Sequence, residues 1–285
     1  MYVKGKWNKN EYRLVEKIGS GNFGSVFKGL DKKGRIRAIK ISKDILSITN
    51  ESNAMERLKG MAFIPRVYDF DDWEINGNTY HFIVMDYIDG YNLKELSNNK
   101  RLNSKSIFKI GKILINILGE VNRLGYKYTD IKLENIILDK RGNIYFVDFG
   151  SLVEKDRPTR EYTPTYNIYS WGLRYSYNNE MAILFSVAMI MITLIGKKVY
   201  NPLIHDLEEV IRQVNTFPIK KAEKQLLVDV LKGRVRTLNQ YKMALSALLD
   251  YGKSFNGLNK IDYILIASIV SFVFIIILGV KSIFY

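Results

Sequence analysis

The chain has 285 residues, which is enough for one large domain or for two lobes. It has no cysteine, which excludes disulfides and thiolate metal sites, and its two histidines, His81 and His205, are too far apart in sequence to indicate a histidine-rich metal site. The 43 Lys and Arg residues against 29 Asp and Glu give a formal net charge of +14, which favours anionic partners or a strongly solvated surface.

Two predicted strands near the N-terminus flank a glycine-rich stretch. The runs 12–18 and 25–29 alternate apolar and polar residues, as strands do. Glycines let a backbone close over phosphate groups and present N–H donors to them. In a dinucleotide-binding fold a helix follows such glycines, but here a further strand is predicted at 35–41. The glycines of this stretch are Gly19, Gly21 and Gly24.

A helix and two more strands are predicted next. In the helix, which is expected to start near residue 50, Glu51 has apolar residues four and seven positions after it, so its side chain is expected to face inward. The strands are predicted at 64–68 and 79–85, and a polar stretch with a glycine over 86–90 ends the second one.

An amphipathic helix and a hairpin follow in the middle of the chain. Apolar residues recur with helical spacing over 104–124. After a short loop, two apolar runs at 136–138 and 144–147 enclose a polar turn with a Gly-Asn pair, which predicts a β-hairpin.

Four polar residues flank this hairpin. Asp130, Lys132 and Asn135 lie at its entrance and Asp148 at its exit, so two acids, an amide and a lysine are expected to converge. Phosphoryl transfer with magnesium needs such a set: oxygen ligands for the metal, a carboxylate facing the attacking hydroxyl, and a cation beside the moving phosphate.

These motifs resemble the catalytic core of the eukaryotic-type protein kinases. D-x-K-x-x-N at 130–135 precedes D-F-G at 148–150, and upstream G-x-G-x-x-G-x-V at 19–26 precedes A-I-K at 38–40. The resemblance extends to small bacterial Ser/Thr kinases of the Hanks type that have one C-terminal span and no extracellular domain, including those of spore-forming Gram-positive bacteria. It implies an α+β, two-lobed protein kinase fold with a small β-rich N-lobe and a helical C-lobe.

The resemblance implies that the substrate is ATP, bound with Mg²⁺ or Mn²⁺, and that Asn135 and Asp148 hold the metal. Lys40 would orient the α- and β-phosphates while an ion pair with Glu51 holds it in place. Glu56 is the alternative partner of Lys40, although it lies off the inward face of the helix.

In the same comparison, Asp130 would orient the substrate hydroxyl and accept its proton, and Lys132 would offset charge on the γ-phosphate. The backbone at 86–88 would pair with adenine, with Met85 limiting the back of the pocket. The expected nucleotide-binding residues are Ile18, Gly19, Gly21, Gly24, Val26, Ala38, Lys40, Asp86, Ile88 and Ile137.

Several positions depart from the family pattern. Tyr128 and Thr129 replace the usual His-Arg before the catalytic aspartate. That arginine normally pairs with a phosphorylated activation loop, so its absence suggests that loop phosphorylation is not required through this contact. Ser170 and Ile183 stand where a structural glutamate and an aspartate are expected.

The stretch Thr163 to Tyr166 resembles the end of a bacterial activation segment, in which Thr163 would touch Asp130 and Lys132. Three threonines of this region are candidate autophosphorylation sites: Thr159, Thr163 and Thr165.

Two long apolar runs lie in the C-terminal half. The run 181–195 has 15 residues, fewer than the roughly 17 that a membrane span needs, so a buried central helix is predicted, with two or three amphipathic helices over 203–249. The run 263–280 has 18 residues and is predicted to cross a membrane. The excess of lysines before this run, with no signal peptide at the N-terminus, predicts a single-pass protein of the cell membrane whose kinase domain is cytoplasmic.

The predicted segments are a kinase domain at 8–250 (N-lobe 8–86, C-lobe 91–250), a juxtamembrane linker at 251–261, a transmembrane helix at 262–281 and a tail at 282–285.

Basic residues cluster at 4–9, 32–37, 94–112 and 220–236. Such clusters suit acidic protein substrates, an anionic lipid surface or DNA.

The sequence therefore predicts a membrane-anchored serine/threonine protein kinase that phosphorylates itself and other proteins. Two alternatives stay open. A pseudokinase would keep the fold and act as a membrane-tethered scaffold. The altered positions at 128, 129, 170 and 183 favour it, and the intact Lys40, Asp130, Asn135 and Asp148 oppose it. A membrane-tethered nucleic-acid binder would use the basic surplus alone.

Overall fold

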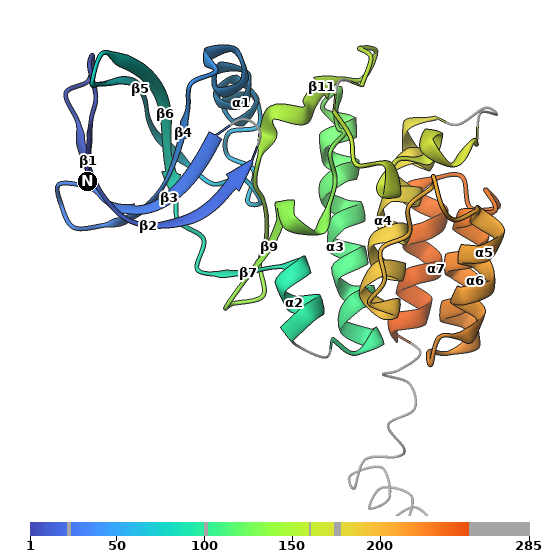
Figure 1. The fold of residues 1–285 in the computed structure, drawn as a ribbon. Helices are drawn as coiled ribbons and strands as arrows, with labels where there is room; N and C mark the ends of the chain where they lie inside the picture. Colours follow the sequence, from blue (N-terminus) through green and yellow to red (C-terminus); the bar gives the residue numbers. More distant parts are fainter. Residues whose placement is uncertain (22–23, 100–101, 160, 174–177, 251–285) are drawn as a thin grey trace, which may run out of the picture.

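The computed structural model describes residues 1–21, 24–99, 102–159, 161–173 and 178–250. The predicted linker, membrane helix and tail over 251–285 lie outside the described residues. The described chain forms a β-rich lobe and a helical lobe, which lie side by side in Figure 1. This arrangement agrees with the predicted α+β class.

The N-terminal lobe is a six-stranded antiparallel sheet in the order β1-β2-β3-β4-β6-β5, with helix α1 packed against it. Ile39, Phe82 and Val84 are completely buried in this sheet and form the centre of its apolar core. The elements are β1 (Tyr2–Lys4), β2 (Glu11–Gly21), β3 (Gly24–Leu30), β4 (Ile36–Ser42), α1 (Ile45–Arg57), β5 (Val67–Ile75) and β6 (Asn78–Asp86).

Two predicted boundaries in this lobe were wrong. The helix begins at Ile45 and not near residue 50, because the side chain of Asp44 caps it by accepting two backbone N–H groups of its first turn. The strand predicted at 64–68 begins only at Val67 and runs on to Ile75. Pro65 has no N–H for a ladder bond, which explains the late start.

Residues before the predicted domain start at 8 also belong to the sheet. Strand β1 pairs with β2, and the loop after it is bound to β5 through Asp71, which accepts backbone N–H groups of Trp7 and Asn8. A Cβ on Gly5 would lie 2.3 Å from a carboxylate oxygen of Asp71, so a larger residue here would displace that carboxylate from its hydrogen bonds.

The C-terminal lobe is built from helices and short strands. Its helices are α2 (Leu93–Asn99), α3 (Ser104–Arg123), α4 (Asn179–Gly196), α5 (Leu207–Thr216), α6 (Lys221–Leu231) and α7 (Leu238–Asp250), with short 3-10 turns η1 (Leu133–Asn135), η2 (Phe149–Ser151), η3 (Pro164–Tyr166) and η4 (Ile168–Trp171). Its strands are β7 (Gly90–Asn92), β8 (Tyr126–Tyr128), β9 (Ile136–Asp139), β10 (Ile144–Phe146) and β11 (Leu152–Glu154).

Helix α4 lies at the centre of this lobe, as the sequence predicted. Every residue from Val187 to Ile192 is fully buried, and α3 packs closely enough that a Cβ on Gly111 would meet Met191 at 2.5 Å. Among the described helices, α4 is the one long and apolar enough to cross a bilayer. Because its middle is enclosed by α3, α6 and α7, its apolar length serves the core of this lobe.

The connection between the lobes starts at Asp86, where β6 ends. The carboxylate of Asp86 accepts hydrogen bonds from the Arg66 N–H and the Tyr68 hydroxyl and lies 3.6 Å from the guanidinium of Arg37. That guanidinium in turn stacks 3.6 Å from the centre of the Tyr68 ring. The side chain of Asp86 is therefore held toward β5, and β7 resumes at Gly90 in the C-lobe.

Candidate active site

The predicted hairpin forms and places two of the predicted polar residues together. Strands β9 and β10 pair with Ile136 opposite Phe146, so Asn135 and Val147 face each other just beyond the ladder, joined by a 2.9 Å backbone hydrogen bond. Asn135 ends η1, and Asp148 follows Val147 directly. The two expected metal ligands therefore project from neighbouring backbone positions.

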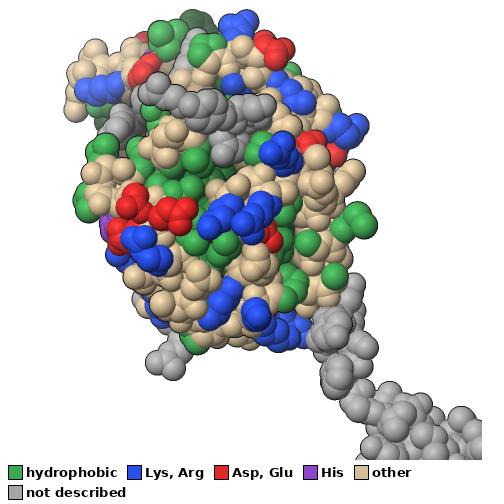
Figure 2. Space-filling view, turned by 90° about the vertical axis from the view of Figure 1, so that its right-hand side faces the viewer, with side chains coloured by type: hydrophobic (Ala, Val, Ile, Leu, Met, Phe, Trp, Pro, Cys, Tyr) green, Lys and Arg blue, Asp and Glu red, His purple; other side chains and the backbone are tan. Residues whose placement is uncertain are grey.

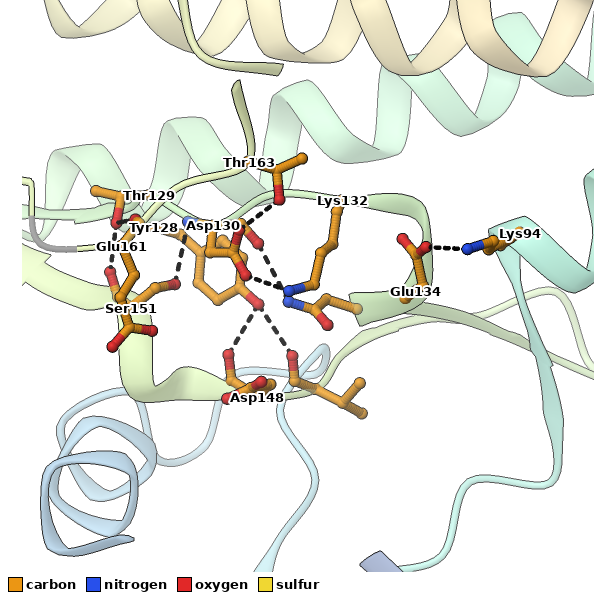
Figure 3. Close-up of polar contacts among 12 residues, drawn as sticks. Lys94, Tyr128, Thr129, Asp130, Lys132, Glu134, Asp148, Ser151, Glu161 and Thr163 are labelled. Carbon is orange, nitrogen blue, oxygen red and sulfur yellow. Dashed lines mark hydrogen bonds and ion pairs between the residues drawn. The ribbon is translucent and has the colours of Figure 1, made fainter. Parts of the chain in front are cut away.

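Asp130 lies at the centre of a network of polar contacts (Figure 3). The hydroxyl of Thr163 donates to one of its carboxylate oxygens at 2.7 Å, and Lys132 forms an ion pair with the other. The amide nitrogen of Asn135 donates to its backbone carbonyl at 3.1 Å. The structure thus brings Asp130, Lys132 and Asn135 together and places the predicted Thr163 contact at Asp130.

Lys40 connects the two lobes. Its ammonium group forms an ion pair with Glu51 of α1 and lies 3.2 Å from a carboxylate oxygen of Asp148 in the C-lobe. Lys40 is 7% exposed and Glu51 is 1% exposed. Helix α1 holds Glu51 there because its apolar residues Ile48 and Met55 are buried on the same side.

The alternative partner of Lys40 is on the surface. The side chain of Glu56 is 64% exposed and pairs with Lys59 one turn further along the chain. The helical spacing therefore identified the correct glutamate, and Glu51 is the carboxylate that meets Lys40.

Burial and neighbouring charges shift the pKa values of this pair. Burial raises the pKa of Glu51 and outweighs the opposing effect of Lys40. For Lys40, burial favours the neutral form, but the carboxylates of Glu51 and Asp148 raise its pKa above the ordinary value. Lys40 is therefore charged, because the neighbouring carboxylates of Glu51 and Asp148 offset the cost of burying its ammonium group.

The described glycines of the glycine-rich stretch lie where β2 ends and β3 begins. These strands pair as far as Gly21 opposite Gly24, and residues 22–23 lie outside the described residues. Gly24 has a φ of +138°, and a Cβ there would lie 2.3 Å from the carbonyl oxygen of Ile41. This backbone needs glycine both for its conformation and for its space.

The other expected nucleotide-binding residues come from both lobes. Val26 on β3 packs against the same core as Ala38, and Ala38 pairs with Met85 in the β4–β6 ladder. Ile137, on the C-lobe strand β9, pairs with β7 directly after the connection between the lobes. The remaining residues are Ile18 and Gly19 at the end of β2, where Ile18 is 44% exposed, and Asp86 and Ile88 in the connection.

The donor set suits magnesium bound together with phosphate. Asp148 offers a carboxylate that is 41% exposed, and the amide nitrogen of Asn135 is engaged by Asp130, which leaves the amide oxygen as the atom able to meet a cation. No group of three acidic or histidine side chains that could hold a metal alone occurs in the described part of the chain. Mg²⁺ commonly binds one or two carboxylates plus substrate phosphates, so these residues fit it.

Tyr128 has an architectural role that the sequence analysis did not assign. Its hydroxyl lies 2.9 Å from the carbonyl oxygens of both Val147 and Asp148, and its ring meets those of Phe146 and Phe149 edge to face. Burial raises the pKa of the Tyr128 hydroxyl well above its ordinary value, so the hydroxyl stays protonated and donates. Tyr128 thereby supports the left-handed backbone (φ 66°) that Asp148 adopts.

The contacts at the other two departures from the family pattern are local. Ile183 packs into the core of the C-lobe, and Ser186, one turn further along α4, donates to the carbonyl of Tyr166 at 2.6 Å. The N–H of Ser170 donates to Asn167 within the turn η4. The end of the activation segment is therefore attached to α4 through a serine hydroxyl.

The site and the two lobes define a class of protein. The sequence pattern of the protein kinase domain matches residues 12–246, which is most of the chain. The chain therefore belongs to the protein kinase domain family.

Several protein kinases of other organisms are similar in sequence to this chain. It is 29% identical to the serine/threonine-protein kinase YabT of Bacillus subtilis over 257 residues, which are 88% of this chain and 74% of that protein. It is 34% identical to a probable casein kinase I homologue of Encephalitozoon cuniculi over 49% of this chain and 45% of that protein. A probable serine/threonine-protein kinase of Bifidobacterium longum, pknA2, is 28% identical over 50% of this chain and 20% of its own length.

The raised pKa of Glu51 predicts an early loss of activity on acidification. Glu51 must be ionised to hold Lys40, and its pKa lies above the ordinary value, so kcat/KM for ATP should begin to fall at a higher pH than an ordinary glutamate would cause. The measurement is the pH profile of kcat/KM for ATP in the native chain and in Glu51→Gln. The variant should be slow at every pH and should lack this decline, and superimposable normalised profiles would contradict the assignment.

Proposed function

We propose that this protein kinase is a membrane-anchored enzyme that transfers the γ-phosphate of ATP to Ser and Thr hydroxyls of protein substrates and to itself. The chain is a protein serine/threonine kinase, given its family and the names of its relatives. The observation that carries the proposal is the convergence of Lys40, Asp130, Asn135 and Asp148, four polar residues from both lobes that an inactive scaffold would not need.

In this proposal Asp130 orients the substrate hydroxyl and accepts its proton. One carboxylate oxygen is held by Thr163 and the other by Lys132, so the carboxylate has one fixed orientation. Lys132 lies beside the reacting group and offsets negative charge as the γ-phosphate moves. Preference for Ser and Thr over Tyr rests on the resemblance of Lys132 to the lysine of the Ser/Thr class.

In this proposal Lys40 binds the phosphates of ATP. Its ammonium group lies between Glu51 and Asp148, where it would meet the α- and β-phosphates of ATP. When bound, Mg²⁺ neutralises phosphate charge, and Asn135 and Asp148 are the residues that would hold it. Because Lys40 contacts Asp148, a residue of the N-lobe and one of the expected metal ligands are held next to each other.

The membrane anchor is the apolar run at 263–280, which lies outside the described residues. Its 18 residues and the lysines before it support a single span with the kinase domain in the cytoplasm.

The net charge of +14 supports additional attraction to anionic lipid and to acidic substrates. On the face seen in Figure 2, Lys and Arg side chains are scattered among acidic and apolar ones.

The Asp130→Asn variant tests the enzymatic part of the proposal. It keeps the shape of the side chain but removes the proton acceptor, so kcat should fall by about 10²- to 10⁴-fold, while KM for ATP changes little. The measurement is incorporation of labelled phosphate into the chain and a protein substrate, with label recovered on Ser and Thr. The exposed Asp156→Asn is the matched control and should behave like the native chain. A native chain that incorporates no phosphate would support the pseudokinase alternative.

Flotation with lipid vesicles tests the anchor. The full chain should float with neutral phosphatidylcholine vesicles at 0.5 M salt, whereas a chain lacking residues 261–285 should stay in the dense fraction, because insertion of an apolar helix resists salt and surface attraction does not. The shortened chain should float only with anionic vesicles at low salt. If both chains behave alike at high salt, the apolar run is not the anchor.

A further inference from the structure

Thr129 stands at the meeting point of three segments of the site. Its hydroxyl lies 3.0 Å from the carbonyl oxygen of Ser151 and 2.6 Å from that of Glu161. Both partners are carbonyls, so the hydroxyl is the donor in both contacts. Ser151 follows the Asp148-Phe149-Gly150 motif, and Glu161 lies near the end of the activation segment.

Two further hydrogen bonds join the Thr129–Asp130 backbone to Ser151. The backbone N–H of Thr129 lies 3.4 Å from the carbonyl of Ser151, and the hydroxyl of Ser151 accepts the backbone N–H of Asp130 at 3.1 Å. Strands β8 and β11 continue this pairing with Tyr128 opposite Leu152. The segment that carries the proton acceptor is therefore fixed to the segment that carries the metal ligand.

The contact with Glu161 controls a different part of the site. Glu161 is two residues before Thr163, whose hydroxyl binds the carboxylate of Asp130. Holding the Glu161 carbonyl thus holds Thr163 in reach of Asp130 (Figure 3). Burial and the negative charges of Asp148 and Asp130 raise the pKa of the Glu161 side chain, and the charges of Lys132 and Lys40 oppose this rise.

The hydrogen bond from the Thr129 hydroxyl to the Glu161 carbonyl joins two uncharged groups. A phosphorylated activation segment needs a cation to bind it, and the residue at this place is a threonine, which offers a hydroxyl proton instead. The hydroxyl has a single proton and two carbonyl acceptors, so its bond to Ser151 remains when residues 161–163 move away. The Thr129 hydroxyl therefore has an acceptor whether residues 161–163 are bound or released, and its contribution to holding them is one neutral hydrogen bond, beside the bond from Thr163 to Asp130.

We propose that Thr129 is a positioning residue whose neutral hydroxyl holds residues 161–163 against the catalytic loop, so that the substrate-binding segment is ordered without phosphorylation. This inference rests on the proposed kinase activity. It goes beyond the absence of an arginine, because it identifies the hydroxyl that does the holding and the two carbonyls that receive it.

The test compares Thr129→Val, which removes the hydroxyl at nearly constant shape, with Thr129→Ser, which keeps it. In the full chain, Thr129→Val should lower kcat/KM for a protein substrate about fivefold, the size of one neutral hydrogen bond, while KM for ATP stays within twofold. Thr129→Ser should restore the native value within twofold. Phosphatase treatment of the native chain should leave its activity within twofold.

The inference is overturned if Thr129→Val equals the native chain, if Thr129→Ser fails to rescue, or if dephosphorylation lowers activity more than tenfold. Hydrogen–deuterium exchange separates this inference from the proposed function, because it needs no activity. The amides of residues 161–166 should exchange several-fold faster in Thr129→Val than in the native chain and in Thr129→Ser. Equal exchange in all three chains contradicts the inference, even if the native chain proves inactive.

Discussion

The buried cation of Lys40 is the constraint on which the rest of the site depends. A nearly fully buried ammonium group is tolerated only beside carboxylates, and here one comes from the N-lobe helix and the other from the C-lobe. The sheet, α1 and the β9–β10 hairpin must therefore be correctly placed together before Lys40 is satisfied. Removing one partner of such a buried pair typically costs about 3–5 kcal/mol, which makes the relative position of the lobes an energetic requirement.

A second theme is that hydroxyl groups attach the segments around the catalytic loop to one another. Tyr128 holds the backbone of Asp148, Thr129 holds the activation segment, and Ser186 holds its end on α4. Each of these bonds is neutral and directed to a backbone carbonyl. These bonds hold Asp148, the activation segment and α4 together although several family positions differ.

Much of this could be predicted from the sequence because the signals are local. The spacing of Asp130, Asn135 and Asp148 around a hairpin, and the inward face that contains Glu51, follow from strand and helix periods alone. The rest could not be predicted, because it depends on residues far apart in the chain. The approach of Thr129 to Glu161, 32 residues later, has no periodic signature, and the start of α1 depended on the cap at Asp44.

The most direct test is a double-mutant cycle on Lys40→Met and Glu51→Gln, with the affinity for ATP and Mg²⁺ measured by calorimetry on the full chain. If Lys40 binds phosphate only when Glu51 holds it, the double variant should bind about as weakly as Lys40→Met alone, with a coupling energy of about 1.4 kcal/mol or more. If the two losses simply add to within about 0.5 kcal/mol, the two side chains act independently, and the ion pair is not what assembles the site.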